Sequence, residues 1–245
     1  MEILSLQKAR LLNIAMKEEL IAETEDFVPE KRTNDQGSVV FKMVHIVAIG
    51  LPVLVVWLAQ PGSSLFSWHP TLMAFSFGFL MVEAILMFSP QSSLISSAPR
   101  ATKVKIHWIL QTSAVVTALG GFAAIYYNKN IYNKAHFQSW HGSLGFCTVI
   151  LICLQSLQGV GVLYSKLPLA SRLKPSQLKQ LHAVCGSLVY LVACITLCLG
   201  FYSSWFVKNV SVYVQGGSVL SALCLAGVII GQVYTEYGLK RRPGT

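Results

Sequence analysis

Residues 66–90 read FSWHPTLMAFSFGFLMVEAILMFSP, a continuous stretch in which His69 and Glu83 are the only strongly ionisable side chains. A helix that crosses the ~30 Å hydrocarbon core of a bilayer needs roughly 20 mainly apolar residues. This stretch is therefore long and apolar enough to span a membrane. Serine, glycine and proline residues on both sides of it indicate where the span ends.

Five further apolar stretches of this kind lie near residues 39–60, 104–127, 138–163, 180–206 and 212–234. The whole chain is 53% hydrophobic and 12% charged, with a mean hydropathy of +0.56, which is too apolar for an ordinary soluble domain. The stretches are too long and too continuous for barrel strands, so only helices can satisfy the backbone within lipid. We predict an all-α membrane protein, a six-transmembrane-helix bundle at 39–235, between tails at 1–38 and 236–245.

Lysine and arginine are distributed unevenly between the two sides that these spans define. Sixteen of the 19 lie on one side, in and just after the N-terminal tail, in the loops 91–106 and 164–179, and in the C-terminal tail. Only Lys129, Lys134 and Lys208 lie on the other side. By the positive-inside rule, both termini are predicted to be cytoplasmic. Orientation and an anionic cytoplasmic leaflet account for the net charge of +9, so no nucleic-acid partner is implied.

Four histidines, His69, His107, His141 and His182, each lie a few residues inside the start of a different predicted helix. Successive spans run in opposite directions, so His69 and His141 fall on the non-cytoplasmic side and the other two on the cytoplasmic side. Ionisable residues within a membrane are candidates for function. Two opposed histidines on neighbouring helices can supply both axial ligands of a haem iron in the core of a helical bundle. We therefore predict two haem sites, one near each membrane face.

Glycine spacing agrees with bulky guests between the helices. Gly159 and Gly200 lie eighteen residues beyond His141 and His182, which is five helical turns. Each glycine is thus on the same face as its histidine but at the opposite side of the membrane, where it can make room for the other haem. Gly121 stands close to four turns beyond the histidine of its own helix. Direct helix packing is the alternative role of any single glycine, whereas the shared spacing favours the haem interpretation.

Other polar residues of the spans carry weaker expectations. His45 and His136 have no opposed partner, so an interfacial or packing role is expected for both. Glu83 is a candidate hydrogen-bond partner or proton carrier, and a carboxyl that reaches towards water is the alternative. No C-x-x-C-H motif is present to attach a haem covalently. Six cysteines in apolar stretches are expected to pack as small buried residues, namely Cys147, Cys153, Cys185, Cys194, Cys198 and Cys224.

Three motifs are distinctive: PGSSLFSWHP at 61–70, which contains His69, FSP at 88–90, and SWHG at 139–142, which contains His141. With these motifs and four histidines in this order, the chain resembles the cytochrome b561 family of transmembrane ascorbate-dependent reductases. SWHG resembles a variant of that family's Ser-Leu-His-Ser-Trp motif. The resemblance is strongest to the short branch of b561 domain-containing proteins related to the tumour-suppressor candidate reductase. It covers roughly residues 40–237.

This resemblance implies two non-covalent haem b groups, one held by His69 with His141 and one by His107 with His182. The same pairing follows independently from the alternation of the spans. The implied enzyme is a transmembrane ascorbate-dependent oxidoreductase, a monodehydroascorbate or ferric reductase. Cytosolic ascorbate would reduce the cytoplasmic haem, and the lumenal haem would reduce monodehydroascorbate radical or ferric iron. No catalytic residue is expected beyond the haem ligands. An endomembrane, endoplasmic reticulum or vesicle, is expected rather than the plasma membrane, and a homodimer is left open.

One motif departs from the family pattern. Well-studied members end their second helix with Ala-Leu-Leu-Val-Tyr-Arg, whereas residues 84–89 of this chain read AILMFS. Both the tyrosine and the arginine are missing, which leaves the family's contact to ascorbate open. Basic residues near the cytoplasmic histidines are candidate ascorbate-binding residues, with a plain role in membrane topology as the alternative. They are Arg100, Lys103, Lys105, Lys174 and Lys179.

Two other classes of protein are alternatives. A metal-ion transporter could use the histidines along its path, but such paths favour carboxylates and broken helices near the midplane, and only Glu83 is available. A structural membrane protein without a cofactor is the second alternative. An absorption spectrum recorded with and without dithionite separates the three, because only the haem protein gives strong haem bands.

Overall fold

A computed structural model describes residues 35–164 and 173–237, and its side chains are described from residue 42 onward. Within these ranges it has six helices that are long and apolar enough to cross a membrane, which confirms the predicted all-α six-helix fold. Most of the predicted N-terminal tail, part of the 164–179 loop with Lys166 and Arg172, and the last eight residues lie outside the described residues.

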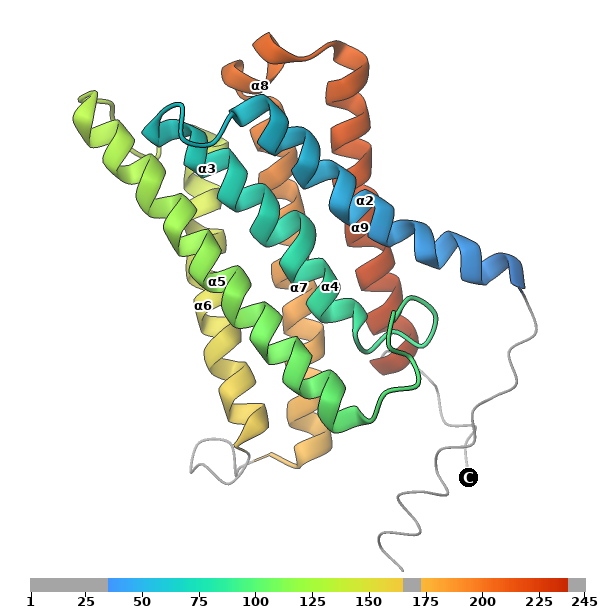
Figure 1. Ribbon diagram of the computed structural model, residues 1–245. Coiled ribbons are helices and arrows are strands. Elements are labelled where there is room, and N and C mark those ends of the chain that lie inside the picture. The colour runs from blue at the N-terminus through green and yellow to red at the C-terminus, as the bar shows by residue number, and fades with distance from the viewer. Residues whose placement is uncertain (1–34, 165–172, 238–245) are drawn as a thin grey trace, which may run out of the picture. The chain divides into compact units, whose positions relative to one another are not determined.

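Figure 1 shows the helices along the chain. The second span consists of three consecutive segments. The bounds are α2 Asp35–Ala59, α3 Leu65–Ala74 continued by the π-helix η1 Phe75–Leu80 and by α4 Met81–Leu86, α5 Arg100–Ile131, α6 Trp140–Leu163, α7 Pro175–Phe201, the short α8 Ser204–Asn209, and α9 Val212–Tyr237.

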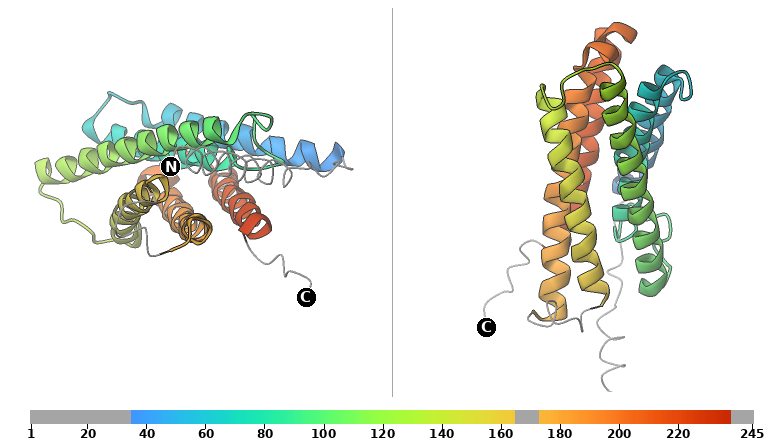
Figure 2. Two further views of the ribbon diagram at one scale, coloured as in Figure 1. Left: turned by 90° about the horizontal axis from the view of Figure 1, so that it is seen from below. Right: turned by 90° about the vertical axis from the view of Figure 1, so that its left-hand side faces the viewer.

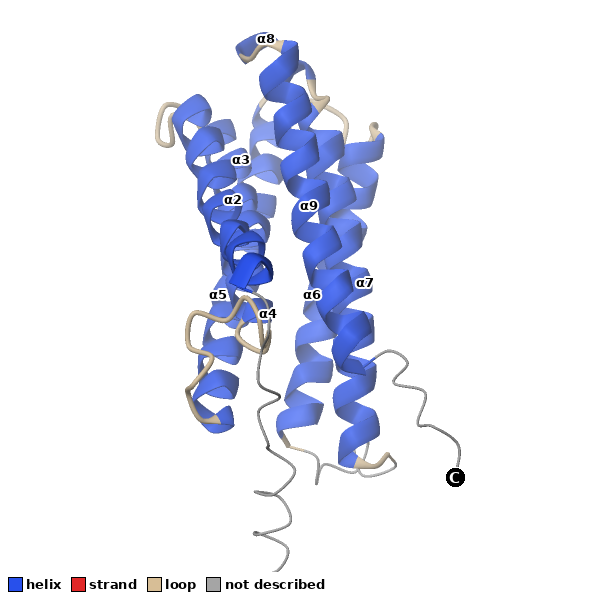
Figure 3. Ribbon diagram, turned by 90° about the vertical axis from the view of Figure 1, so that its right-hand side faces the viewer, coloured by secondary structure: helices blue, strands red, loops and turns tan. Residues whose placement is uncertain are grey.

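The spans form two layers. One layer holds α2, the α3–η1–α4 span and α5, and the other holds α6, α7 and α9 (Figures 2 and 3). Within the layers α3 packs against α5, α6 against α7, and α7 against α9, while α5 also contacts α6 across them. The two antiparallel helix pairs α3–α5 and α6–α7 are therefore neighbours, and these four spans carry the four histidines of interest.

The π-helix in the second span lies where the two layers meet. The fully buried Tyr190 of α7 donates its hydroxyl to the Phe77 carbonyl at 3.3 Å, and Ser76 donates to the Ala114 carbonyl of α5 at 2.7 Å. A Cβ added to Gly78 would lie 3.0 Å from Pro52 of α2. A π-helix contains an extra residue relative to an α-helix, so the residues that follow it are displaced by one position from the α-helical register.

The two ends of the fifth span differ most from the sequence expectation. The fifth span begins at Pro175 rather than near 180, as proline is favoured at the first helical position. It also ends earlier, at Phe201, because Ser203 accepts a hydrogen bond from the backbone N–H of Phe206 and begins the separate helix α8. Hydropathy alone does not detect this break, since α8 contains Trp205 and Phe206 and reads as a continuation of the apolar run.

His45 and Glu83 form a buried pair between α2 and α4. Each residue is 7% exposed, and His45 Nδ1 lies 2.8 and 2.9 Å from the two carboxyl oxygens. The other ring nitrogen donates to the Ser92 carbonyl at 2.7 Å. One proton lies between the ring and the carboxyl, so the pair is neutral whichever partner holds it. Glu83 is thus a hydrogen-bond partner, as expected, and its carboxyl does not reach water, whereas His45 has a buried acidic partner in place of the expected interfacial or packing role.

Replacing Glu83 with Ala should strongly destabilise the protein, because His45 keeps its buried position and loses its partner. Leaving a buried hydrogen-bonding group of a neutral ring without its partner costs on the order of 1–3 kcal/mol. We expect a clearly lower Tm for the purified protein in detergent, while Glu236→Ala, at an exposed glutamate of α9, leaves the Tm nearly unchanged. Equal Tm values for the two variants would show that the pair does not stabilise the fold.

Candidate functional site

The starts of the helices set the depth of the histidines. Ser64 before α3 and Ser139 before α6 each accept a hydrogen bond from the backbone N–H three residues later, at 3.2 and 3.1 Å. Serine is favoured at this N-cap position because its oxygen satisfies a backbone N–H that has no partner within the helix. His69 and His141 therefore lie in the first turns of their helices, at the same end of the bundle.

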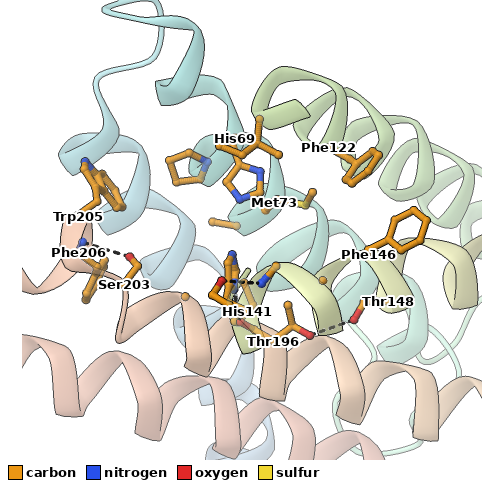
Figure 4. Close-up of a pocket in the computed structure, with 18 of the residues that line it drawn as sticks. His69, Met73, Phe122, His141, Phe146, Thr148, Thr196, Ser203, Trp205 and Phe206 are labelled. Carbon is orange, nitrogen blue, oxygen red and sulfur yellow. Dashed lines mark hydrogen bonds between the residues drawn. The ribbon is translucent and has the colours of Figure 1, made fainter. Parts of the chain in front are cut away.

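His69 and His141 point towards one another across the two layers (Figure 4), with ring centroids 6.0 Å apart and ring planes at 76°. Nδ1 of His69 donates to the Gly121 carbonyl of α5 at 3.0 Å, and Nδ1 of His141 donates to the Thr196 carbonyl of α7 at 3.0 Å. A carbonyl oxygen can only accept, so each neutral ring carries its proton on Nδ1. Nε2 of each ring is then free to bind a metal.

His107 and His182 form the equivalent pair at the other end of the bundle, with ring centroids 6.3 Å apart and planes at 82°. Nδ1 of His107 donates to the Ala84 carbonyl of α4 at 2.8 Å. Nδ1 of His182 faces the side-chain nitrogen of Gln155 at 3.0 Å instead of a carbonyl. The alternation of the spans thus paired the histidines as the structure brings them together, and their ligation of iron stays a prediction.

The acceptor carbonyls obey a common spacing. Gly121 lies fourteen residues after the histidine of α5, and Thr196 fourteen residues after the histidine of α7. Fourteen residues are close to four helical turns. Each of these two helices therefore bears a histidine of one pair and, four turns later, a carbonyl that accepts the hydrogen bond of a histidine of the other pair. Ala84 lies fifteen residues after His69, and the additional residue is the one that η1 contributes. The π-helix therefore keeps the Ala84 carbonyl directed at His107.

The two spaced glycines lie beside the opposite pairs, as their spacing predicts. A Cβ added to Gly200 would lie 3.1 Å from Cε1 of His141, and one added to Gly159 would lie 3.2 Å from Cε1 of His182. Both distances are shorter than ordinary van der Waals contacts. What these glycines directly accommodate is the histidine ring of the neighbouring helix, which refines the expectation that they make room for a cofactor.

A cavity of about 260 Å³ adjoins His69 and His141. Its walls are mostly apolar and aromatic, as ligand pockets usually are, and include Phe66, Met73, Phe77, Phe122, Phe146, Leu197, Trp205 and Phe206, several of which Figure 4 draws. Lys129 and His136 also line it. His136 stacks on Tyr126 at 4.4 Å and bonds to Asn130 at 2.7 Å, in keeping with its expected packing role.

The donor set fits a haem. Two imidazole–metal bonds of roughly 2 Å each, plus the distance from each ring centre to its edge, give a centroid separation of about 6 Å, which both pairs show. Within the described residues, no group of three or more His, Cys, Asp and Glu side chains comes together. Two protein ligands are enough for a haem iron because the porphyrin supplies the others. Both two-histidine donor sets therefore fit a haem.

The basic candidates near His107 differ in their contacts. The Arg100 guanidinium lies 5.9 Å from the centroid of the Phe88 ring, and that ring lies 5.2 Å from the ring of His107. Lys103 donates to the Ser96 carbonyl at 2.8 Å. Of the five candidates, Arg100 is thus linked to His107 through the Phe88 ring. Its place in the sequence did not indicate this contact. The side chains of the remaining candidates are exposed, namely Lys105, Lys174 and Lys179.

Comparisons with known proteins agree with this geometry. A family model described as eukaryotic cytochrome b561 matches residues 68–207. The chain is 42% identical to the transmembrane reductase CYB561D2 of Bos taurus over 81% of this chain and 88% of the relative. It is 37% identical to the probable transmembrane reductase CYB561D1 of Mus musculus, over 80% and 84%. It is 26% identical to the transmembrane ascorbate-dependent reductase CYB561 of Sus scrofa, over 84% of both chains.

Replacing Gly200 with Val should abolish haem binding expected at the His69–His141 pair, because any Cβ there meets the His141 ring at 3.1 Å and a branched side chain must displace it. The haem-to-protein ratio of the purified variant, from its absorption spectrum, should fall by one, as it should for His141→Ala.

Gly216→Val is the matched control, since a Cβ on Gly216 meets nothing within 4 Å. It should keep the ratio of the unmodified protein. A full haem complement in Gly200→Val with an unchanged spectrum would mean that the contact does not position His141.

Proposed function

The chain belongs to the cytochrome b561 family, and on this premise we propose that it transfers electrons from cytosolic ascorbate to monodehydroascorbate radical or ferric iron on the lumenal side. Membership makes it a membrane-embedded reductase that binds haem b. The observation that carries the proposal is the presence of two opposed histidine pairs, one at each end of the bundle.

Two haem b groups are proposed, one held by His69 and His141 and the other by His107 and His182. When bound, each haem supplies a one-electron couple on its iron. The protein fixes the orientation of every ligand through its Nδ1 contact to the neighbouring helix. Gly121 is level with the first pair and lies fourteen residues from His107, so the pairs are separated by roughly 21 Å along α5. A single site could not bridge a membrane, whereas two sites in series divide the distance.

The donor is proposed to bind near the His107–His182 pair. The relative from Sus scrofa is named an ascorbate-dependent reductase, which supports ascorbate as the donor. Ser89 stands where the family motif has arginine, and its hydroxyl accepts a hydrogen bond from the Ser92 N–H within the turn. The guanidinium of Arg100, from the start of α5, lies over the Phe88 ring next to Ser89. A guanidinium can bind an anionic enediol by charge-assisted hydrogen bonds.

The distribution of basic residues supports the proposed sidedness. Arg100, Lys103 and Lys105 lie at the end of the bundle that holds the His107–His182 pair, and Lys129 and Lys208 belong to the opposite end. With both termini in the cytosol, the His107–His182 pair faces the donor and the His69–His141 pair faces the lumen. An endomembrane, endoplasmic reticulum or vesicle, is the proposed location.

Neutralising the basic cluster should slow haem reduction by ascorbate. We expect the triple variant Arg100→Gln, Lys103→Gln, Lys105→Gln to be reduced about tenfold more slowly at low salt, because electrostatic steering of an anion is lost. The difference should shrink at high salt, where exposed charges are screened. Stopped-flow absorbance of the purified protein measures both rates.

The double variant Lys134→Gln, Lys208→Gln is the matched control, since it removes positive charge from the opposite side. Its rate of reduction by ascorbate should stay close to that of the unmodified protein. If the triple variant reacts at the same rate as this control at every salt concentration, the cluster does not receive the donor.

Sidedness can be measured by cysteine labelling at two exposed lysines, Lys208→Cys and Lys105→Cys. A membrane-impermeant maleimide added to sealed vesicles in which the cytosolic face points inward should label position 208 and leave position 105 unlabelled until detergent is added. The unmodified protein gives the background from the native cysteines. Labelling of position 105 alone would invert the protein and the proposed direction of electron flow.

A further inference from the structure

The four candidate ligands differ in what their Nδ1 atoms face. His69, His107 and His141 each donate to a backbone carbonyl of a neighbouring helix. His182 instead faces the side-chain amide of Gln155, whose nitrogen lies 3.0 Å from Nδ1 and 2.8 Å from the backbone oxygen of His182. One of the two proposed haem sites thus depends on a side chain that can be replaced.

The position of Gln155 is built into the packing of α6 against α7. Gln155 lies fourteen residues after the histidine of α6, and Thr196 lies fourteen residues after the histidine of α7. A glycine four residues after each histidine faces these two side chains: a Cβ on Gly145 would lie 3.5 Å from Thr196, and a Cβ on Gly186 only 2.8 Å from the Gln155 nitrogen. The Gln155 amide therefore fills the space that Gly186 leaves.

Hydrogen bonding makes this contact dependent on the proton of the ring. An amide nitrogen has two N–H groups and accepts nothing. One N–H donates to the backbone oxygen of His182, and the other is attracted to Nδ1 only while Nδ1 lacks a proton. Iron binding through Nε2 requires the ring proton on Nδ1. The amide then has to present its oxygen to the Nδ1–H, close to the backbone oxygen of His182, so this hydrogen bond is weaker than the three made to carbonyls.

We propose that Gln155 is a positioning residue for His182 whose amide oxygen accepts the Nδ1–H in the haem-bound protein and sets the reduction potential of the His107–His182 haem apart from that of the other haem. This inference rests on the proposed pair of haems. An acceptor on Nδ1 makes an imidazole ligand more basic and stabilises the oxidised iron. Removing the acceptor therefore raises the potential of this haem alone.

The test is a potentiometric titration followed by haem absorbance, carried out in a His69→Ala background so that the His107–His182 haem is the one that remains. Gln155→Leu should raise the midpoint reduction potential of this haem. At fixed ambient potential, the ratio of reduced to oxidised haem should rise about tenfold, which is equivalent to about 59 mV for one electron. Gly186→Ala should raise it as well, because its Cβ displaces the amide without altering residue 155.

Two further variants complete the set. Gln155→Glu keeps an acceptor oxygen and should not raise the midpoint. Gln232→Leu makes the same chemical change at a glutamine whose amide donates to the Ile85 carbonyl, and it too should leave the midpoint unchanged. Loss of this haem in Gln155→Leu together with retention in Gln155→Glu also supports the positioning role.

Equal midpoints in Gln155→Leu, Gly186→Ala and the parent protein would overturn the inference and leave the proposed function standing. If the unmodified protein, with His69 intact, binds fewer than two haems, that result would instead overturn the proposed function, and this inference with it. The two failures are thus read from different measurements, the midpoint in one case and the haem count in the other.

Discussion

A neutral imidazole inside a membrane has to donate its N–H to an acceptor, and in this bundle the main acceptor is the backbone carbonyl of the neighbouring antiparallel helix. His69, His107 and His141 all satisfy this requirement in the same way. The hydrogen bond fixes the tautomer and the orientation of the ring together. Because a backbone carbonyl is available only where a helix passes at the right height, ligand positions and helix register depend on one another.

Much of the remaining structure follows from that register. Each ligand-bearing helix has its histidine near its start and its contact to the opposite pair about four turns later, so antiparallel pairing produces two sites from one repeated arrangement. The π-helix at Phe75–Leu80 keeps this arrangement intact in the second span, where the acceptor comes one residue later. Gly159 and Gly200 let the rings lie against the backbone of the neighbouring helix, where even a Cβ would lie 3.1–3.2 Å from a ring carbon.

Sequence alone could predict the features that depend on composition and on helical period: six spans, the pairing of the histidines by alternating direction, and the two glycines near the opposite pairs. It could not reveal η1, because one extra residue in a helix leaves hydropathy unchanged. It also missed the side-chain contacts that tertiary packing creates, such as His45 with Glu83 and Arg100 over Phe88. Gln155 had a detectable signal, since its spacing from His141 equals that of Gly121 from His107.

In the proposed function, each of the two histidine pairs holds one haem b. The most direct measurement is the number of haems per polypeptide in the purified unmodified protein, from a pyridine haemochrome assay against protein determined by amino-acid analysis. We expect two non-covalent haem b groups per chain, both low-spin and both reducible by dithionite. A ratio of one, a high-spin iron with an open coordination position, or the absence of haem bands would contradict it.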